Sequence, residues 1–120
     1  MALKVGVKDS GEVTVLTLSG RITLGDESDQ LRNRIKATIG KEKKHLVLDL
    51  SEVTRIDSAG LGTLVSSYTT VSNAGGQLKL ANLTKKFSET LAITKLVTVF
   101  EVYDSVEEAV RSFEPTHGGR

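Results

Sequence analysis

One hexapeptide, Asp57-Ser58-Ala59-Gly60-Leu61-Gly62, combines residue types that could do chemistry. It places a hydroxyl beside a carboxylate at the point where an extended apolar run gives way to a helical pattern. Serine is a preferred N-cap, whereas glycine inside a helix costs about 1 kcal/mol relative to alanine. Close approach of another protein to the serine would explain small residues there, and an ordinary cap with tight helix packing would explain them equally well. The residues alone leave both interpretations open.

Other catalytic and ligand-binding patterns are weak. Ser58 lacks the G-x-S-x-G elbow of α/β-hydrolases, because Ile56 stands two residues before it. His45 and His117 are the only histidines that could complete a catalytic triad. No phosphate-binding glycine loop is complete, and no His, Asp or Glu residues stand at metal-ligand spacing. The sequence therefore predicts a protein that is not an enzyme and that has no cofactor or metal site.

Composition narrows the class of protein further. The chain has 120 residues, 26% of them charged and 38% hydrophobic, which suits one soluble globular domain. The absence of Cys excludes a disulfide scaffold, thiolate zinc sites and thiol catalysis. We expect the domain to span residues 1–114 and to be followed by a flexible tail over 115–120.

Charge and hydropathy favour a location and exclude some partners. A net charge of +1 argues against a nucleic-acid partner bound by bulk electrostatics. The short lysine clusters at 41–44 and 85–86 are interpreted as solvated loops. No apolar run approaches the roughly 20 residues that span a bilayer, and the first residues lack the features of a signal peptide. We therefore expect a cytoplasmic protein without membrane insertion.

Hydrophobic periodicity predicts the elements that position the hexapeptide. Period-two alternation on both sides of Asp9-Ser10-Gly11 indicates a hairpin whose second strand ends at Gly20. After it, strands and helices alternate, which predicts an α/β fold with a mixed, mainly parallel sheet and helices packed against it. The predicted order is ββαβαβαβα, with strands at about 3–8, 13–20, 46–50, 77–81 and 97–103 and helices at about 26–39, 58–73, 84–91 and 105–113.

The helix that follows Ser58 has two predicted faces. Leu61, Leu64, Val65 and Tyr68 recur at i, i+3, i+4 and i+7, which is typical of a buried stripe. The hydroxyl-bearing residues between them are expected on the exposed face. These are Ser66, Ser67, Thr69, Thr70 and Ser72.

The segments around the hexapeptide resemble the STAS family of anti-sigma factor antagonists. The resemblance starts at His45-Leu46-Val47-Leu48-Asp49-Leu50-Ser51 and includes Ile56-Asp57-Ser58-Ala59-Gly60-Leu61-Gly62. It continues through Gly75-Gly76-Gln77-Leu78-Lys79-Leu80 and the stretch from Leu91 to Leu96, and ends in Val102-Tyr103-Asp104-Ser105-Val106-Glu107-Glu108-Ala109. Because these segments follow one order over nearly the whole chain, the resemblance implies a single STAS-like domain.

That resemblance implies a function and a set of residues. In the family, a serine at the position of Ser58 is phosphorylated by an anti-sigma factor that is itself a serine/threonine kinase, and a phosphoserine phosphatase reverses the reaction. The unphosphorylated antagonist binds the kinase and frees a sigma factor. By resemblance, Ser58 is the phosphoacceptor and the chain is a kinase substrate with no catalysis of its own. The implied partner-binding residues are Asp57, Ser58, Ala59, Gly60, Leu61, Thr23 and Asp26.

One loop departs from the family pattern. The family commonly has Gly, two further residues and then Asp before the first helix, whereas Gly20-Arg21-Ile22 is followed here by Thr23. The acid comes later, at Asp26, where the dipole of the helix favours negative charge without any further role. This loop bears on which partner is bound. The alternative function is a STAS interaction module of a lipid-transport ABC system or a signalling scaffold, and either a monomer or a weak dimer is compatible with the sequence.

Overall fold

The computed structural model describes residues 3–113, which form one five-stranded sheet and its helices. The strand order is β1-β2-β3-β4-β5; β1 and β2 pair antiparallel and the other neighbours pair parallel. The predicted α/β class and the order ββαβαβαβα are therefore confirmed. The elements are β1 (Leu3–Ser10), β2 (Val13–Ile22), α1 (Asp26–Gly40), β3 (His45–Ile56), α2 (Ser58–Asn73), β4 (Gln77–Ala81), α3 (Lys85–Thr94), the 3-10 helix η1 (Leu96–Thr98), β5 (Glu101–Tyr103) and α4 (Val106–Arg111).

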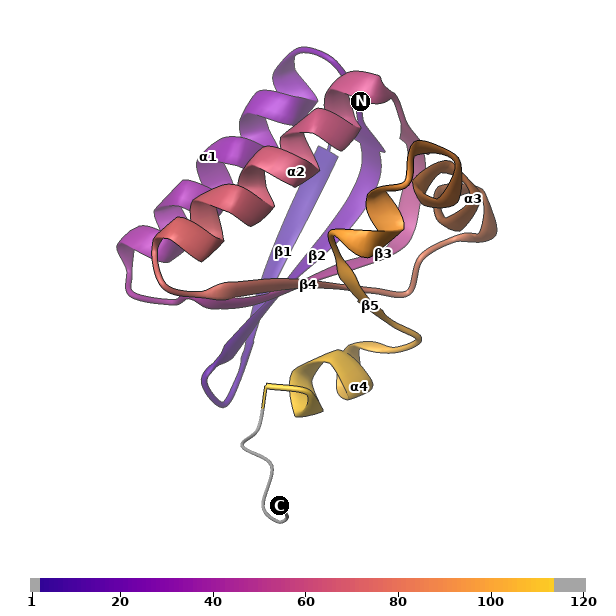
Figure 1. Ribbon diagram of the computed structural model, residues 1–120. Helices are drawn as coiled ribbons and strands as arrows, with labels where there is room; N and C mark the ends of the chain where they lie inside the picture. The colour runs from indigo at the N-terminus through magenta and orange to yellow at the C-terminus, as the bar shows by residue number, and fades with distance from the viewer. Residues whose placement is uncertain (1–2, 114–120) are drawn as a thin grey trace.

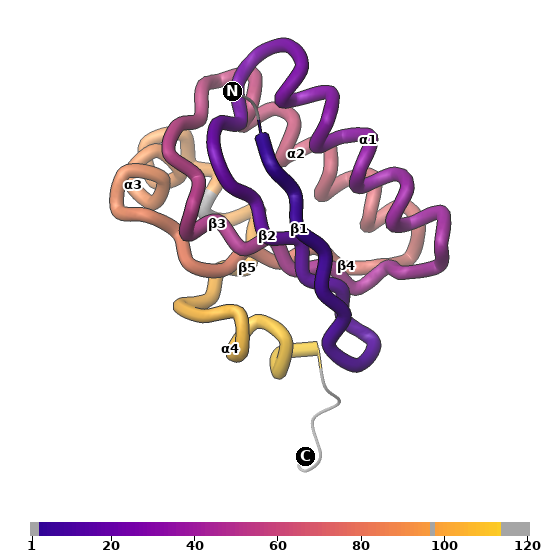
Figure 2. Tube along the Cα trace, turned by 180° about the vertical axis from the view of Figure 1, so that it is seen from behind, coloured from indigo at the N-terminus to yellow at the C-terminus, as the bar shows by residue number. Residues whose placement is uncertain are grey.

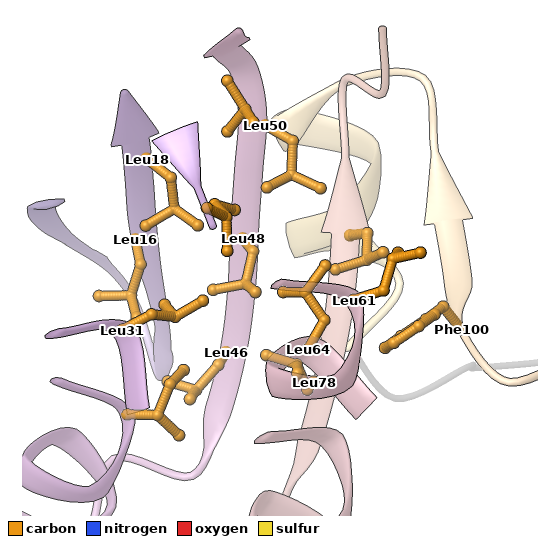
Figure 3. Packing of buried hydrophobic residues seen from close by; sticks show 14 of the residues in the cluster. Leu16, Leu18, Leu31, Leu46, Leu48, Leu50, Leu61, Leu64, Leu78 and Phe100 are labelled. Atoms are coloured by element: carbon orange, nitrogen blue, oxygen red, sulfur yellow. The ribbon is translucent and has the colours of Figure 1, made fainter. Parts of the chain in front are cut away.

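The sheet carries helices on both faces. Helices α1 and α2 lie side by side on one face, and α4 covers part of the other (Figure 1). On the α1–α2 side, leucines of β2 and β3 point toward those of the two helices (Figure 3). A smaller cluster under α4 contains Val15, Val47 and Ala109. The apolar run 46–50 in β3 is thus covered on both faces, as continuous hydrophobic strands usually are.

The two ends of the sheet carry different features. The β2–α1 connection, the start of α2 and helix α3 lie toward one end, where β2 and β3 finish (Figures 1 and 2). The β1–β2 turn and α4 lie toward the other end. Ligand sites in open α/β sheets form at the carboxyl ends of the parallel strands. The hexapeptide that follows β3 occupies that position.

The first hairpin differs from its prediction at Gly11 and at Gly20. Ser10 still pairs with Val13, so the turn consists of Gly11 and Glu12 rather than residues 9–11, and Gly11 adopts a φ of 63°. Strand β2 does not end at Gly20 but runs on to Ile22. The register of β2 against β3 shifts between Thr17 and Ser19 and again between Gly20 and Arg21, and Gly20 has a φ of 106°. At each shift β3 has one residue more than β2, as in a β-bulge, and such an irregularity bends the paired strands without ending them.

The predicted strand over 97–103 is wrong in its first half. Residues 96–98 form a 3-10 helix, and only Glu101–Tyr103 pair with β4. The chain leaves α3 through Lys95, which has a φ of 64°, and then buries Phe100, whose ring packs nearly perpendicular to the Tyr68 ring. The need to bring Phe100 into the core outweighs the strand propensity of the β-branched residues before it.

Two predictions about the chain's extent fall partly outside the described residues. The proposed domain limits of 1 and 114 and the tail over 115–120 lie beyond residues 3–113. Over residues 3–113, no helix has the length and hydropathy needed to cross a membrane.

Candidate functional site: the start of helix α2

Ser58 is the first residue of α2 and its side chain is exposed. The N-cap is the preceding residue, Asp57, whose Oδ1 accepts a hydrogen bond of 2.8 Å from the Gly60 N–H. Within residues 3–113, the Ser58 hydroxyl has no hydrogen-bond partner. The interpretation of Ser58 as an ordinary cap is therefore wrong, because Asp57 performs that task and leaves the hydroxyl available.

Asp57 also ties the start of α2 to the loop between β2 and α1. Its Oδ2 accepts a hydrogen bond of 3.0 Å from the Leu24 N–H, and its own N–H donates to the Ile22 carbonyl at 3.4 Å. The hydrogen bonds from the Gly60 and Leu24 amides stabilise the carboxylate and hold the pKa of Asp57 below its ordinary value. The negative charge beside Ser58 is thus fixed in place by backbone donors.

The two glycines of the hexapeptide have different surroundings. A Cβ added to Gly60 would lie 1.9 Å from the Ile22 carbonyl oxygen and 2.8 Å from its carbon, which no side chain tolerates. A Cβ on Gly62 would meet nothing within 4 Å. Gly60 therefore permits α2 to pack closely against the end of β2, whereas Gly62 leaves a bare surface one turn along the helix.

The remaining predicted partner-binding residues fall into an exposed and a buried group. Asp26, the first residue of α1, is exposed, and Thr23 and Ala59 are half-buried. Gly60 and Leu61 were expected on the partner-binding surface, but both are buried and face the interior, with Leu61 in the main core. Their packing positions the start of α2, which carries the exposed residues.

One exposed residue at this end was missed by the sequence analysis. Leu24 has 77% of its surface exposed, and its amide is the one held by Asp57. The available signal was a single leucine in an otherwise polar loop, Thr23-Leu24-Gly25-Asp26. An isolated exposed leucine is common, so its position beside Ser58 becomes informative only in three dimensions.

The hydrolase alternative is not supported by the placement of His45. This histidine is the first residue of β3, and Ser58 follows the last residue of the same strand. Twelve residues of extended strand put them more than about 30 Å apart. His45 instead stacks on Phe113, with 5.1 Å between the ring centroids. His117 lies outside the described residues, and within residues 3–113 no three His, Asp or Glu side chains gather as metal ligands would.

Comparisons with known proteins point to one family. The model of the STAS domain family matches residues 4–109. The anti-sigma F factor antagonist of Paenibacillus polymyxa is 24% identical over 115 residues, which cover 95% of this chain and 97% of that protein. The anti-sigma-B factor antagonist of Bacillus subtilis is 27% identical over 92% of this chain and 100% of its own length.

Solved structures share the fold. An anti-sigma factor antagonist from Mycobacterium paratuberculosis superposes with a TM-score of 0.78 at 23% identity and covers 92% of each chain. The Bacillus cell fate determinant SpoIIAA in its phosphorylated form gives 0.71 at 17% identity and covers 92% of this chain and all of that one. Its unphosphorylated form gives 0.68 at 17% identity and covers 91% of this chain and 96% of that one. The murine anion transporter Slc26a9 matches 86% of this chain with only 18% of its own, at a TM-score of 0.73 and 22% identity.

Proposed function

The chain belongs to the STAS domain family, and on that basis we propose that it is an anti-sigma factor antagonist that acts by binding. In the proposed cycle the unphosphorylated chain binds an anti-sigma factor kinase and frees a sigma factor. Phosphorylation of Ser58 ends that binding, and a phosphoserine phosphatase restores it. The observation that carries the proposal is the exposed, uncommitted Ser58 hydroxyl at the start of α2.

The chemistry of the site supports a phosphate there without unfolding. A phosphoserine adds about −1.5 to −2 charges and three acceptor oxygens, and a helix start offers free N–H groups. SpoIIAA has been solved with the same fold in both its phosphorylated and unphosphorylated forms. On a docking surface the phosphate would have to be desolvated, and the fixed charge of Asp57 adds repulsion to it. A loss of about 3 kcal/mol would weaken binding more than a hundredfold.

Exposure divides the predicted partner residues into two roles. Under the proposal, Ser58 and the accessible parts of Thr23, Asp26 and Ala59 contact the kinase. Asp57 holds the β2–α1 loop against the start of α2. The buried Gly60 and Leu61 let the start of this helix pack closely on the sheet. The exchange would take place in the cytoplasm, where ATP and sigma factors are available.

A capture and phosphorylation experiment tests the proposal. The chain is used to capture its partner from the native cell, and the partner is then incubated with ATP and fresh protein. Mass spectrometry should find one phosphate, on Ser58, and the phosphorylated protein should release the partner. Ser58→Ala should abolish the modification. Ser72→Ala, at another exposed serine of α2, should leave it unchanged. A phosphate on another residue would contradict the assignment of Ser58.

A phosphomimetic variant separates an effect on binding from an effect on folding. Ser58→Asp should keep the unfolding midpoint of the wild type, because the side chain is exposed, and should bind the captured kinase more than a hundredfold more weakly. Unfolding of this variant, or kinase affinity equal to that of the wild type, would refute the mechanism. A captured partner without kinase activity would instead favour an interaction module of a lipid-transport system or a signalling scaffold.

A further inference from the structure

A cleft beside the start of α2 has no role in the function proposed so far. It encloses about 320 Å³ between the carboxyl end of β3 and helix α3. Val53 and Phe87, both buried, contribute to its walls, and Asp57 closes it on the side of α2. The cleft is therefore continuous with the surface that presents Ser58.

Two cationic side chains line this cleft. Arg55 comes from β3 and Lys86 from the first turn of α3, and both are exposed. Residues 3–113 form five ion pairs, and neither Arg55 nor Lys86 takes part in any of them. Both charges are thus available to a group from outside the domain.

The polar groups around these cations are already committed. Thr54 donates to the Gly20 carbonyl at 3.1 Å, and Thr84 caps α3 by accepting from the Phe87 N–H at 3.2 Å. Both carboxylate oxygens of Asp57 accept backbone N–H bonds. The cleft therefore offers two cations that form no ion pair, beside the apolar walls, and the single negative charge of Asp57 at its edge offsets only part of their positive charge.

A protein that takes Ser58 into its active site must also cover this cleft. Ile56 and Asp57 line the cleft, and Ser58 is the next residue along the chain. Covering Arg55 and Lys86 without a countercharge would leave two cations desolvated and unpaired, which is strongly unfavourable. A partner that binds here therefore has to bring negative charge to that place.

We propose that the cleft between β3 and α3 receives an acidic segment of the anti-sigma factor kinase, with Arg55 and Lys86 pairing its carboxylates. This inference rests on the proposed function, because it identifies the chemistry of the kinase surface that docks beside Ser58. Apolar stems of glutamate side chains suit the walls formed by Val53 and Phe87, and their carboxylates reach the cationic rim.

Binding measurements with three alanine variants test this inference. Arg55→Ala and Lys86→Ala should each weaken binding of the captured kinase by about tenfold or more, as loss of a close charge pair at an interface does. Both should also reduce the dependence of the affinity on salt. Lys85→Ala is the matched control: it removes a neighbouring exposed cation of α3 that does not line the cleft, and it should change the affinity little.

The outcomes distinguish this inference from the function on which it rests. If the kinase phosphorylates Ser58 but binds all three variants like the wild type, the acidic docking segment is refuted and the switch stands. If Lys85→Ala has the same effect as the other two variants, the general positive potential of this surface, rather than the cleft, is responsible for the loss of kinase affinity. Amide shifts around Arg55 and Lys86 on titration with inorganic phosphate or ATP, without an effect of the variants on the kinase, would identify a small-anion site instead. A partner that is not a kinase would overturn both proposals.

Discussion

Ser58 presents a free hydroxyl because its neighbour Asp57 has taken over the capping of the helix. The sequence indicates this segment through its residue types and predicts a helix start within one residue. It does not indicate which of the two residues caps α2, because serine and aspartate are equally good caps. In the fold the Asp57 carboxylate also accepts a hydrogen bond from the Leu24 amide, 33 positions earlier in the chain, a contact that the local sequence does not reveal.

The two glycines of the hexapeptide provide a matched pair of substitutions. Gly60→Ala should destabilise the domain by about 1–3 kcal/mol, because the new methyl group overlaps the Ile22 carbonyl and must push α2 away from β2. Gly62→Ala has open space and should stabilise α2 by up to about 1 kcal/mol. Urea unfolding of both variants measures the difference. Equal effects would mean that the close approach at Gly60 does not fix the helix.

Ser67 was predicted on the exposed face of α2 but is buried, with 2% of its surface exposed. Its hydroxyl has no partner among residues 3–113, and a buried unpaired hydroxyl costs about 1–3 kcal/mol. Ser67→Ala should therefore raise the stability by about 1 kcal/mol in thermal or urea unfolding. Thr63→Val is the control and should lower it, because the buried Thr63 hydroxyl donates to the Ala59 carbonyl and accepts from Arg32. A loss of stability in Ser67→Ala would contradict the conclusion that the buried Ser67 hydroxyl lacks a hydrogen-bond partner.

At the scale of elements, one side chain couples the β2–α1 loop to helix α2. Hydrogen bonds from the Gly60 and Leu24 amides lower the pKa of Asp57 from its ordinary value of 3.8. Its stabilising contribution is therefore complete above the unfolded value and disappears as the pH falls through the lower folded value. Asp57→Asn should be less stable than the wild type at neutral pH, and this difference should shrink below a pH of about 4.

Unfolding curves of the two proteins across the acid range check this dependence. Asp9 and Glu101 also have lowered pKa values, but they are present in both proteins and cancel in the difference. A stability difference that stays constant with pH would show that the carboxylate charge is not what holds the loop to the helix.

The helices and strands were predictable where the hydrophobic pattern within the segment itself decides the conformation. Helix α2 and strand β4 were predicted at their observed limits. The helix predicted from about 105 begins at Val106, and Ser105 is its N-cap, with a side chain that accepts a hydrogen bond from the Glu108 N–H. The errors lie where non-local contacts decide the conformation. The strand predicted from 97 is interrupted because Phe100 packs against Tyr68, and β2 passes Gly20 because β3 continues beside it.

At the scale of the whole molecule, the nearly neutral charge makes the proposed modification easy to detect. One phosphoserine would change the net charge from +1 to about −0.5 to −1. The phosphorylated chain should therefore be retained longer on an anion exchanger at neutral pH than the untreated chain. Ser58→Ala, treated identically with the kinase and ATP, should elute unchanged. A shift that persists in this variant would indicate modification elsewhere.

The separation of the two ends of the sheet has a practical consequence. The Gly11–Glu12 turn lies at the end of the sheet away from Ser58, and the ten residues of β2 between them span about 30 Å. The domain can thus be tethered or labelled at this turn, on a sensor chip or with a fluorophore, while α2 and its neighbouring cleft stay open to solution. A larger assembly could use the same arrangement to display the serine outward from an anchored domain.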